Sequence, residues 1–158
     1  MRTKLRRLMV AANLLFVSCL GIYGEDGAAK LATYDAVVAD PGHHRVVFEN
    51  EKVRVLEVIV KPGEKEAFHV HLMPTVMTII TGAKLRLTLA TLEDDKVVIG
   101  KSMEIGNDNL QPPPLWMGPE MLHSFENIGA VTFHAYRVEL KGEEGSKQTP
   151  GTGAATPP

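Results

Sequence analysis

Residues 62–82 read PGEKEAFHVHLMPTVMTIITG, and this stretch decides both the fold and the chemistry to look for. Two histidines, His69 and His71, stand one residue apart, between a turn-like segment and a run rich in β-branched residues. In an extended strand, side chains two residues apart point to the same face, so both imidazoles project together. Two neighbouring imidazoles are typical of a metal site, although an inward histidine can also be a hydrogen-bonded core residue.

Short apolar runs separated by turn signals fill the chain from residue 43 to 141. KLRLTLA at 84–90 alternates apolar and polar side chains, and TLEDDKVVIGKSMEI at 91–105 has the form of a hairpin with its turn at an acidic pair. VRVLEVIV at 53–60 is apolar on both faces, so its inward face is not indicated. Short strands at regular spacing predict an all-β sandwich or barrel.

The first 24 residues have the pattern of an export signal. Basic residues precede an apolar run from Leu8 to about Tyr23, which is shorter than the roughly 20 residues of a membrane span. We therefore expect a signal peptide at 1–24 and a periplasmic or secreted protein. Two alternatives stay open: a helix that docks on the domain or anchors it, and lipidation, because LFVSC ending at Cys19 resembles a bacterial lipoprotein signal. Only the anchored forms would place the protein at a membrane.

The composition after this leader excludes several ligands and partners. Cys19 is the only cysteine, so the remaining chain offers neither a disulfide nor a thiolate ligand. Without Arg2, Lys4, Arg6 and Arg7 of the leader, 13 basic residues face 19 acidic ones. Because phosphate binding needs a basic patch, we expect no nucleic-acid partner.

Three segments follow the leader. Residues 25–42 form an N-terminal extension with a turn-like DPG, and we expect it to wrap onto the domain. Residues 43–141 form one domain. Residues 142–158 are rich in glycine, proline, threonine and serine, and we expect this tail to be disordered. The pattern indicates no helix beyond the leader.

A third histidine, His123, lies in PPPLWMGPEMLHSFENIG at 112–129. It is far from His69 and His71 in the sequence, and it meets them only if the β-structure folds back on itself. Three imidazoles from two strands can close one face of a metal ion.

These motifs resemble those of the cupins, a family of small double-stranded β-helix barrels. The first cupin motif has a glycine, a His-x-His pair, a glutamate and a final glycine; the matching residues here are Gly63, His69, His71 and Gly82. The second motif has a histidine followed four residues later by an asparagine, matched by His123 and Asn127, while its Pro-x-Gly is degraded to GPE at 118–120. The resemblance covers about residues 43–141 and looks like that of small, exported, single-domain bacterial cupins. It implies an all-β jelly-roll barrel with a divalent metal at His69, His71 and His123.

The first motif lacks its glutamate. Thr75 stands at the family's glutamate position, and no Asp, Glu, Asn or Gln occurs between Ala67 and Leu92. Three neutral imidazoles would leave a divalent ion with its full charge and an open position, which is a catalytic pattern. Such an ion favours an anion there, either a hydroxide or a substrate carboxylate.

The expected function is a metal-binding cupin that acts as a small-molecule oxygenase or related oxidoreductase, with iron, manganese, zinc or copper at the three histidines. Cupin dioxygenases of small thiols are similar in having three histidines and no glutamate. The alternative is a module that holds a metal or a small anionic ligand without turnover, or a pocket without metal. No catalytic residue can be named from the sequence. A homodimer is expected because a barrel of this size leaves sheet edges to cover.

Residues near the C-terminal strand give weaker indications. VTFHAYRVEL at 131–140 places His134 and Tyr136 on one face, beside the site if that face points inward and outside the barrel if it does not. An inward pair would serve proton transfer and would allow a sugar epimerase or isomerase. Arg137 could hold a carboxylate.

Two histidines and several large apolar residues are expected to have ordinary roles. His43 and His44 follow DPG in a loop, and we expect them at the surface. The apolar residues near the motifs are expected to form a pocket wall: Met73, Met77, Trp116, Met117, Met121 and Phe125.

Overall fold

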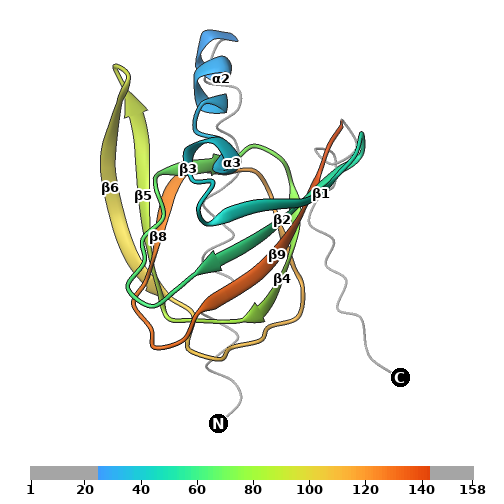
Figure 1. Cartoon of the computed structure of the whole chain (residues 1–158). Coiled ribbons are helices and arrows are strands. Elements are labelled where there is room, and N and C mark those ends of the chain that lie inside the picture. Colours follow the sequence, from blue (N-terminus) through green and yellow to red (C-terminus); the bar gives the residue numbers. More distant parts are fainter. Residues whose placement is uncertain (1–24, 143–158) are drawn as a thin grey trace.

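The computed structural model describes residues 25–142, which form a barrel of antiparallel strands with two short helices at one end (Figure 1). The expected signal peptide at 1–24, and all but the first residue of the expected tail at 142–158, lie outside the described residues. Within 25–142, no helix has the length and apolar character needed to cross a membrane. The helices α2 (Glu25–Ala32) and α3 (Ala36–Ala39) belong to the N-terminal extension and differ from the helix-free expectation.

The strands of the described region are arranged in two sheets. The five-stranded sheet has the order β1-β2-β9-β4-β7, and the four-stranded sheet has the order β3-β8-β5-β6. Their bounds are β1 (His44–Glu49), β2 (Val53–Val60), β3 (His69–His71), β4 (Thr75–Thr81), β5 (Leu85–Glu93), β6 (Lys96–Ile105), β7 (Leu115–Met117), β8 (Glu120–Asn127) and β9 (Phe133–Leu140).

The strand pairing is that of a double-stranded β-helix. Strands β5 and β6 form an antiparallel hairpin, and around it β4 pairs with β7, β3 with β8, and β2 with β9, all antiparallel. One long two-stranded ribbon is therefore wound so that its strands alternate between two sheets, which is the jelly-roll arrangement. The all-β jelly-roll fold expected from the sequence is confirmed by this order.

Two motif residues hold the turns of the barrel in place. Gly63 has a φ of 81° in the turn after β2, a conformation that glycine adopts without strain. The buried Asn127 side chain donates to the carbonyls of Val60 and Val131, both at 2.8 Å, and its carbonyl oxygen accepts the Gly129 N–H. The asparagine of the second motif thus acts as a structural clamp between the ends of β2 and β8.

The apolar side chains form two clusters. The larger one draws mainly on β2, β5 and β9 and contains Leu56, Val58, Val60, Ala83, Leu85, Phe133 and Ala135. The second joins the barrel to the N-terminal extension, because Leu31 of α2 packs with Val70 and Leu122. The Val70 N–H also donates to the Tyr34 carbonyl at 2.8 Å. The extension therefore packs onto the barrel, as the sequence suggested.

Strand β9 buries every second residue, and its inward face combines apolar with charged side chains. His134 and Tyr136 lie on the outer face, where both contact Glu57, at 3.1 and 2.9 Å. The inward positions include Arg137 and Glu139, which are 3% and 0% exposed. Alternation correctly separated the two faces, but the histidine–tyrosine pair needed for an isomerase is outside the barrel.

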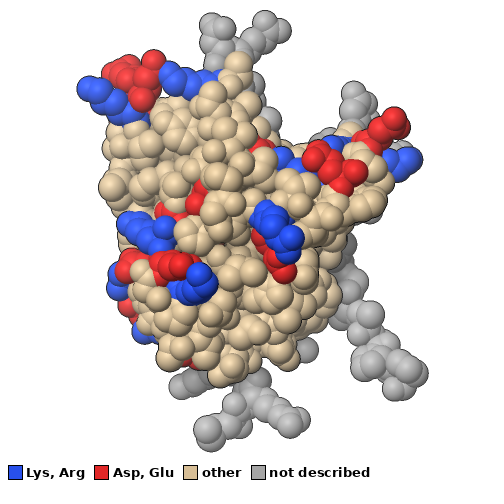
Figure 2. Space-filling model, viewed as in Figure 1, with Lys and Arg blue, Asp and Glu red and all other residues tan. Residues whose placement is uncertain are grey.

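Strand β1 forms an edge of the five-stranded sheet and exposes Val46, Val47 and Phe48. The homodimer expected from open sheet edges stays a prediction. On the face shown in Figure 2, basic and acidic side chains lie next to one another in small groups. The ion pairs of Lys84 with Glu104 and of Arg86 with Glu126 have this character.

Candidate metal centre

The fold brings the three histidines of the two motifs together inside the barrel. His69 and His71 occupy alternate positions on β3, and His123 lies directly opposite His69 on the neighbouring strand β8. Residues opposite one another on paired strands share a face, so the three rings point the same way. The ring centroids of His69 and His123 are 4.5 Å apart, and those of His71 and His123 are 5.8 Å apart.

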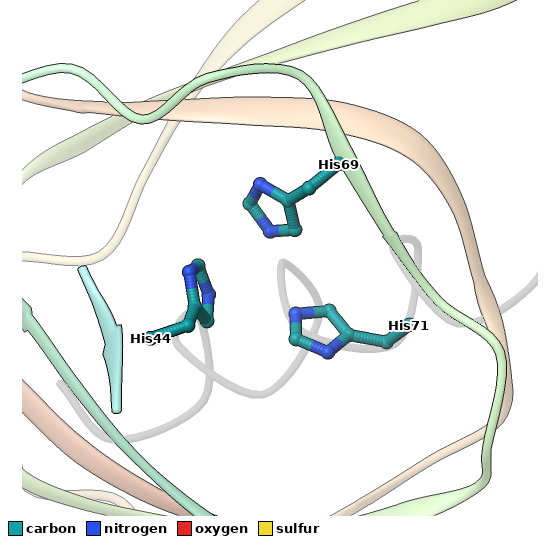
Figure 3. Close-up of side chains that lie close together, drawn as sticks. All are labelled: His44, His69 and His71. Atoms are coloured by element: carbon teal, nitrogen blue, oxygen red, sulfur yellow. The ribbon is translucent and has the colours of Figure 1, made fainter. Parts of the chain in front are cut away.

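A fourth histidine, His44, joins this cluster, and the expectation that it lies at the surface is wrong. His44 begins β1 and is 3% exposed. Its ring lies 4.5 Å from that of His69 and 5.3 Å from that of His71, and the three side chains point toward one another (Figure 3). Each of these residues offers a ligand atom within 4.8 Å of the others. His44, His69 and His71 therefore form a group that could bind a metal ion.

The DPG turn explains why His44 points inward. The backbone N–H of His44 donates to the Asp40 carbonyl at 3.1 Å, and its Nδ1 lies 3.3 Å from the same oxygen. The adjacent His43 points elsewhere and contacts the Asp40 carboxylate through Nδ1, at 2.9 and 3.0 Å. The turn thus separates two consecutive histidines, one into the cluster and one toward Asp40 and Glu64.

All four clustered histidines use Nδ1 for a hydrogen bond within the protein. The Nδ1 of His69 lies 2.9 Å from the Ala67 carbonyl, and that of His123 lies 2.7 Å from the Met121 carbonyl. Because a carbonyl only accepts, the ring proton is on Nδ1 and the lone pair is on Nε2. The Nε2 atoms of His69 and His123 are buried and have no hydrogen-bond partner among the described residues. Buried, unpartnered lone pairs are what a metal ion would use.

The electrostatics of the cluster keep its imidazoles neutral. Burial lowers the pKa of His69 to about 2 and that of His44 to about 3, and the neighbouring histidines and Arg137 lower both further. Burial also lowers the pKa values of His71 and His123. Neutral imidazole is the form that coordinates metals, so these groups need not lose a proton at neutral pH to bind an ion.

Glu66, three residues before His69, is a buried carboxylate at the same cluster. One oxygen lies 3.8 Å from Nε2 of His44 and the other 3.9 Å from Nε2 of His69. The carboxylate also accepts the Phe125 N–H at 3.2 Å. Burial raises the pKa of Glu66 to about 8, because no lysine or arginine pairs with it among the described residues. A second group with metal-ligand geometry consists of Asp40, His44 and Glu66.

A second buried carboxylate, Glu139, contacts the Nδ1 side of the His71 ring. Its Oε1 lies 2.8 Å from Nδ1 of His71, and its Oε2 accepts from Nε of Arg54 at 2.5 Å. Arg54 in turn donates to both oxygens of Asp35, at 3.0 and 2.9 Å. A chain of charged groups therefore connects the N-terminal extension to one imidazole of the cluster. Carboxylates in this position fix the tautomer and orientation of metal-binding histidines.

Arg137 places a buried positive charge beside the cluster. It forms an ion pair with Glu120, and its electrostatic effect lowers the pKa values of the four clustered histidines. Its Nε is buried without a hydrogen-bond partner in the described part of the chain. Arg137 is therefore a candidate donor to an anion held in the barrel.

Thr75, which stands at the sequence position of the motif's glutamate, begins strand β4. It is fully buried on β4, directly opposite Glu139 on β9, and its hydroxyl has no partner among residues 25–142. The carboxylates that approach the cluster come instead from Glu66, ahead of the His-x-His pair, and from Glu139 on the last strand. The motif's glutamate is absent, as the sequence indicated, but two buried carboxylates from other positions lie near the imidazoles.

This donor set fits a divalent transition-metal ion. Imidazole suits zinc, copper, iron and nickel, and a carboxylate extends the range to manganese. His69, His71 and His123, the ligands expected from the sequence, lie together in the barrel with His44. The assignment of these residues as ligands stays a prediction, as does the identity of the metal.

Comparison with known proteins shows structural likeness only. No family model matches the chain, and no curated protein matches it. A cupin domain from Bordetella pertussis Tohama I is 21% identical over 63% of this chain and 92% of its own length, with a TM-score of 0.45. A cupin family protein with a double-stranded β-helix fold from Methanocaldococcus jannaschii is 16% identical over 61% and 77% of the two chains, with a TM-score of 0.41.

A third similar structure is a conserved protein with a double-stranded β-helix domain from Klebsiella pneumoniae. It is 18% identical over 70% of this chain and 85% of its own, with a TM-score of 0.40. At such identities the likeness concerns the fold alone.

Proposed function

We propose that this protein is a metal-binding cupin that holds one divalent transition-metal ion inside the barrel and serves as a small-molecule oxygenase or related oxidoreductase. The observation that carries the proposal is the convergence of buried, neutral imidazoles from three separate strands, two of them with unpartnered Nε2 atoms. The cost of burying unpartnered polar atoms suggests that a ligand completes the cluster.

The residues of the chain have distinct roles in this proposal. His44, His69, His71 and His123 would hold the ion through Nε2, and the Nδ1 partners described above hold each ring in position. Redox-active iron, bound here, would supply electron transfer between a small substrate and dioxygen. The apolar shell that includes Phe125, whose ring lies 5.3 Å from that of His123, restricts water at the site.

A small anion is the proposed substrate class. Arg137 carries a buried guanidinium whose Nε is free to donate, and an ion with neutral imidazole ligands attracts negative charge. Glu120 neutralises part of the Arg137 charge, so the guanidinium can remain buried when no anion is bound. The positive charge of Arg137 would attract a carboxylate or thiolate that binds near the ion.

Oxygen uptake tests this function. Protein loaded with ferrous iron under anaerobic conditions is mixed with air-saturated buffer and a panel of small carboxylates and thiols. The proposal predicts uptake with at least one anion, and an Arg137→Lys variant, which keeps the charge but loses the Nε donor, should raise KM more than it lowers kcat. Absence of uptake across a broad panel would remove the oxygenase proposal while leaving metal binding intact.

One observation favours a second candidate, a metal-holding or sensing module without turnover. Each of the four imidazoles is at most 3% exposed, so a substrate must displace protein groups to reach the ion. Tight metal binding together with no oxygen uptake is the result that this candidate predicts. Export to the periplasm or beyond is proposed for either function on the pattern of residues 1–24.

A further inference from the structure

We infer that Glu66 is a direct ligand of the metal ion. It precedes the His-x-His pair in the sequence and replaces the carboxylate that is missing after the pair, where Thr75 stands. This inference rests on the proposed metal binding and adds a carboxylate to it. The two Glu66 oxygens lie 3.8 and 3.9 Å from Nε2 of His44 and Nε2 of His69. Those separations exceed a hydrogen bond. Two ligand atoms at about 2.0–2.2 Å from one ion are about 2.8–3.6 Å apart at octahedral or tetrahedral angles, so an inward shift of the side chains by a few tenths of an ångström would bring Glu66 into a shared coordination shell.

The local backbone aims Glu66 at the cluster. The Glu66 N–H donates to the Phe125 carbonyl at 2.8 Å, its own carbonyl accepts the Ser124 hydroxyl at 2.7 Å, and the carboxylate accepts the Phe125 N–H. These contacts fasten the residue to β8 beside His123. The side chain is therefore positioned by the fold before any ion binds.

Other buried carboxylates near the cluster are already engaged. Glu139 binds Arg54 and His71 Nδ1, and Glu120 pairs with Arg137. Asp40 faces His43 Nδ1 at 2.9 Å. Glu66 alone among these four lacks both an arginine and a hydrogen bond to an imidazole within the described residues. It also faces the Nε2 of His69, which is itself buried and unpartnered.

The electrostatic consequence concerns which ions fit. A carboxylate with two or more imidazoles is the donor set of non-haem ferrous sites and also suits manganese, whereas imidazoles alone favour copper and zinc. One negative charge in the ligand set lowers the net charge of the bound centre by one. We therefore expect Glu66 to shift selectivity toward iron and manganese, the ions that the proposed redox function needs.

The test compares Glu66→Gln with wild type and with Glu64→Gln, a matched control that removes a more exposed carboxylate from the same turn. Glutamine keeps the size of the side chain and can still accept the Phe125 N–H, but it loses the charge. Manganese and zinc are titrated into metal-free protein by calorimetry at pH 7, and thermal unfolding is recorded with and without each ion.

Glu66→Gln should weaken manganese binding by at least about tenfold, which is the lower end for changes to metal-site partners, and should weaken zinc binding less. The same variant should be no less stable than wild type without metal, since the cost of burying an acidic side chain without a cationic partner is removed. Glu64→Gln should behave as wild type. If Glu66 had only a structural role, Glu66→Gln would instead lower the stability of the metal-free protein and leave the manganese affinity unchanged.

Unchanged manganese affinity in Glu66→Gln overturns the inference. Failure of wild type to bind any ion would overturn the proposed function itself, so the two failures are distinguishable. If Glu66→Gln does not fold, Glu66→Asp keeps the charge but withdraws the oxygens by one methylene. Weaker manganese binding by that variant supports coordination by Glu66, and unchanged affinity overturns it.

Discussion

The Glu139 carboxylate lies 2.8 Å from Nδ1 of His71, although the two residues are far apart in sequence and both are buried. Glu139 also pairs with Arg54, which fixes the carboxylate in place. Because the carboxylate accepts from Nδ1, the lone pair of His71 is on Nε2, which faces the interior. Glu139 on β9 therefore fixes the tautomer and the ring orientation of His71 on β3.

Glu139→Gln should weaken metal binding by about 10- to 100-fold, the range found when the partner of a metal-binding histidine is lost. An amide still fills the space, but it no longer stabilises the His71 N–H as a carboxylate does. Calorimetric titration of metal-free protein with zinc measures the change. Glu126→Gln, a partly exposed carboxylate on β8, is the control and should bind as wild type does. Equal affinities for both variants would show that Glu139 only stabilises Arg54.

His44→Ala and His43→Ala form a matched pair of neighbouring substitutions. His44 belongs to the group with ligand geometry, whereas His43 turns away toward Asp40. We expect His44→Ala to lower zinc affinity at least about tenfold and His43→Ala to leave it within a factor of about two. The same titration measures both. The reverse ranking would place His44 outside the metal centre.

The stability of the metal-free protein should depend on pH in a way that the buried groups determine. Folded-state pKa values near 3 for His44 and near 2 for His69 lie below the unfolded value of 6.5, so the unfolded state binds more protons and stability falls as pH drops below about 6.5. Glu66 acts oppositely, because its folded pKa of about 8 exceeds the unfolded 4.5, and stability falls as pH rises from about 4.5 to about 8.

Burial also raises the pKa of Glu139, but the four clustered histidines outnumber these two carboxylates, so the maximum should lie near pH 6.5. Each group contributes a slope of up to about 1.4 kcal/mol per pH unit in its own window. Urea denaturation of metal-free protein at a series of pH values measures this curve. Glu66→Gln should make the decline between about pH 6.5 and 8 shallower. A variant that retains the full decline would show that other groups cause it.

Asp35→Asn should loosen the N-terminal extension from the barrel. Asparagine can still cap α3 through Oδ1, as Asp35 does. The variant therefore removes mainly the negative charge beside Arg54 and the hydrogen bond that Oδ2 accepts from Arg54. We expect a loss of about 1–3 kcal/mol in the free energy of unfolding, measured by denaturant titration. Asp94→Asn is the control, because Asp94 is exposed with a φ of 44° that asparagine tolerates. Equal stability of both variants would mean that the Asp35–Arg54 pair contributes nothing.

The sequence predicted the barrel and the convergence of His69 and His71 because both depend on local rules. Alternation in strands places residues two apart on one face, and turn residues mark where the strands end. The position of His123 beside His69 and His71 could be predicted only from the resemblance to the two cupin motifs. The pairing of β3 with β8 joins segments far apart in the sequence, and neither segment alone indicates it.

The residues whose position the sequence did not indicate are polar or charged side chains that the fold buries. His44 follows a turn and reads as a surface residue, yet hydrogen bonds to Asp40 direct it inward. Arg137 and Glu139 share one face of β9 with Phe133 and Ala135, and the alternation of this segment did not indicate which face points inward. Their burial is compensated by ion pairs with Glu120 and Arg54, which no single segment reveals. Glu66 lies in PGEKEAF at 62–68, ahead of the His-x-His pair. This segment is charged and contains Pro and Gly, so the sequence indicates an exposed turn, yet Glu66 is buried.

The most direct test of the account is the metal content of the protein purified without a polyhistidine tag. It should be measured by elemental analysis, as isolated and after reloading separately with iron, manganese, zinc and copper, for wild type and a His69→Ala/His71→Ala double variant. We expect close to one ion per chain in the wild type and loss of that ion in the variant. A wild-type protein that retains no ion after any reloading, or a double variant that retains the same ion equally well, would contradict it.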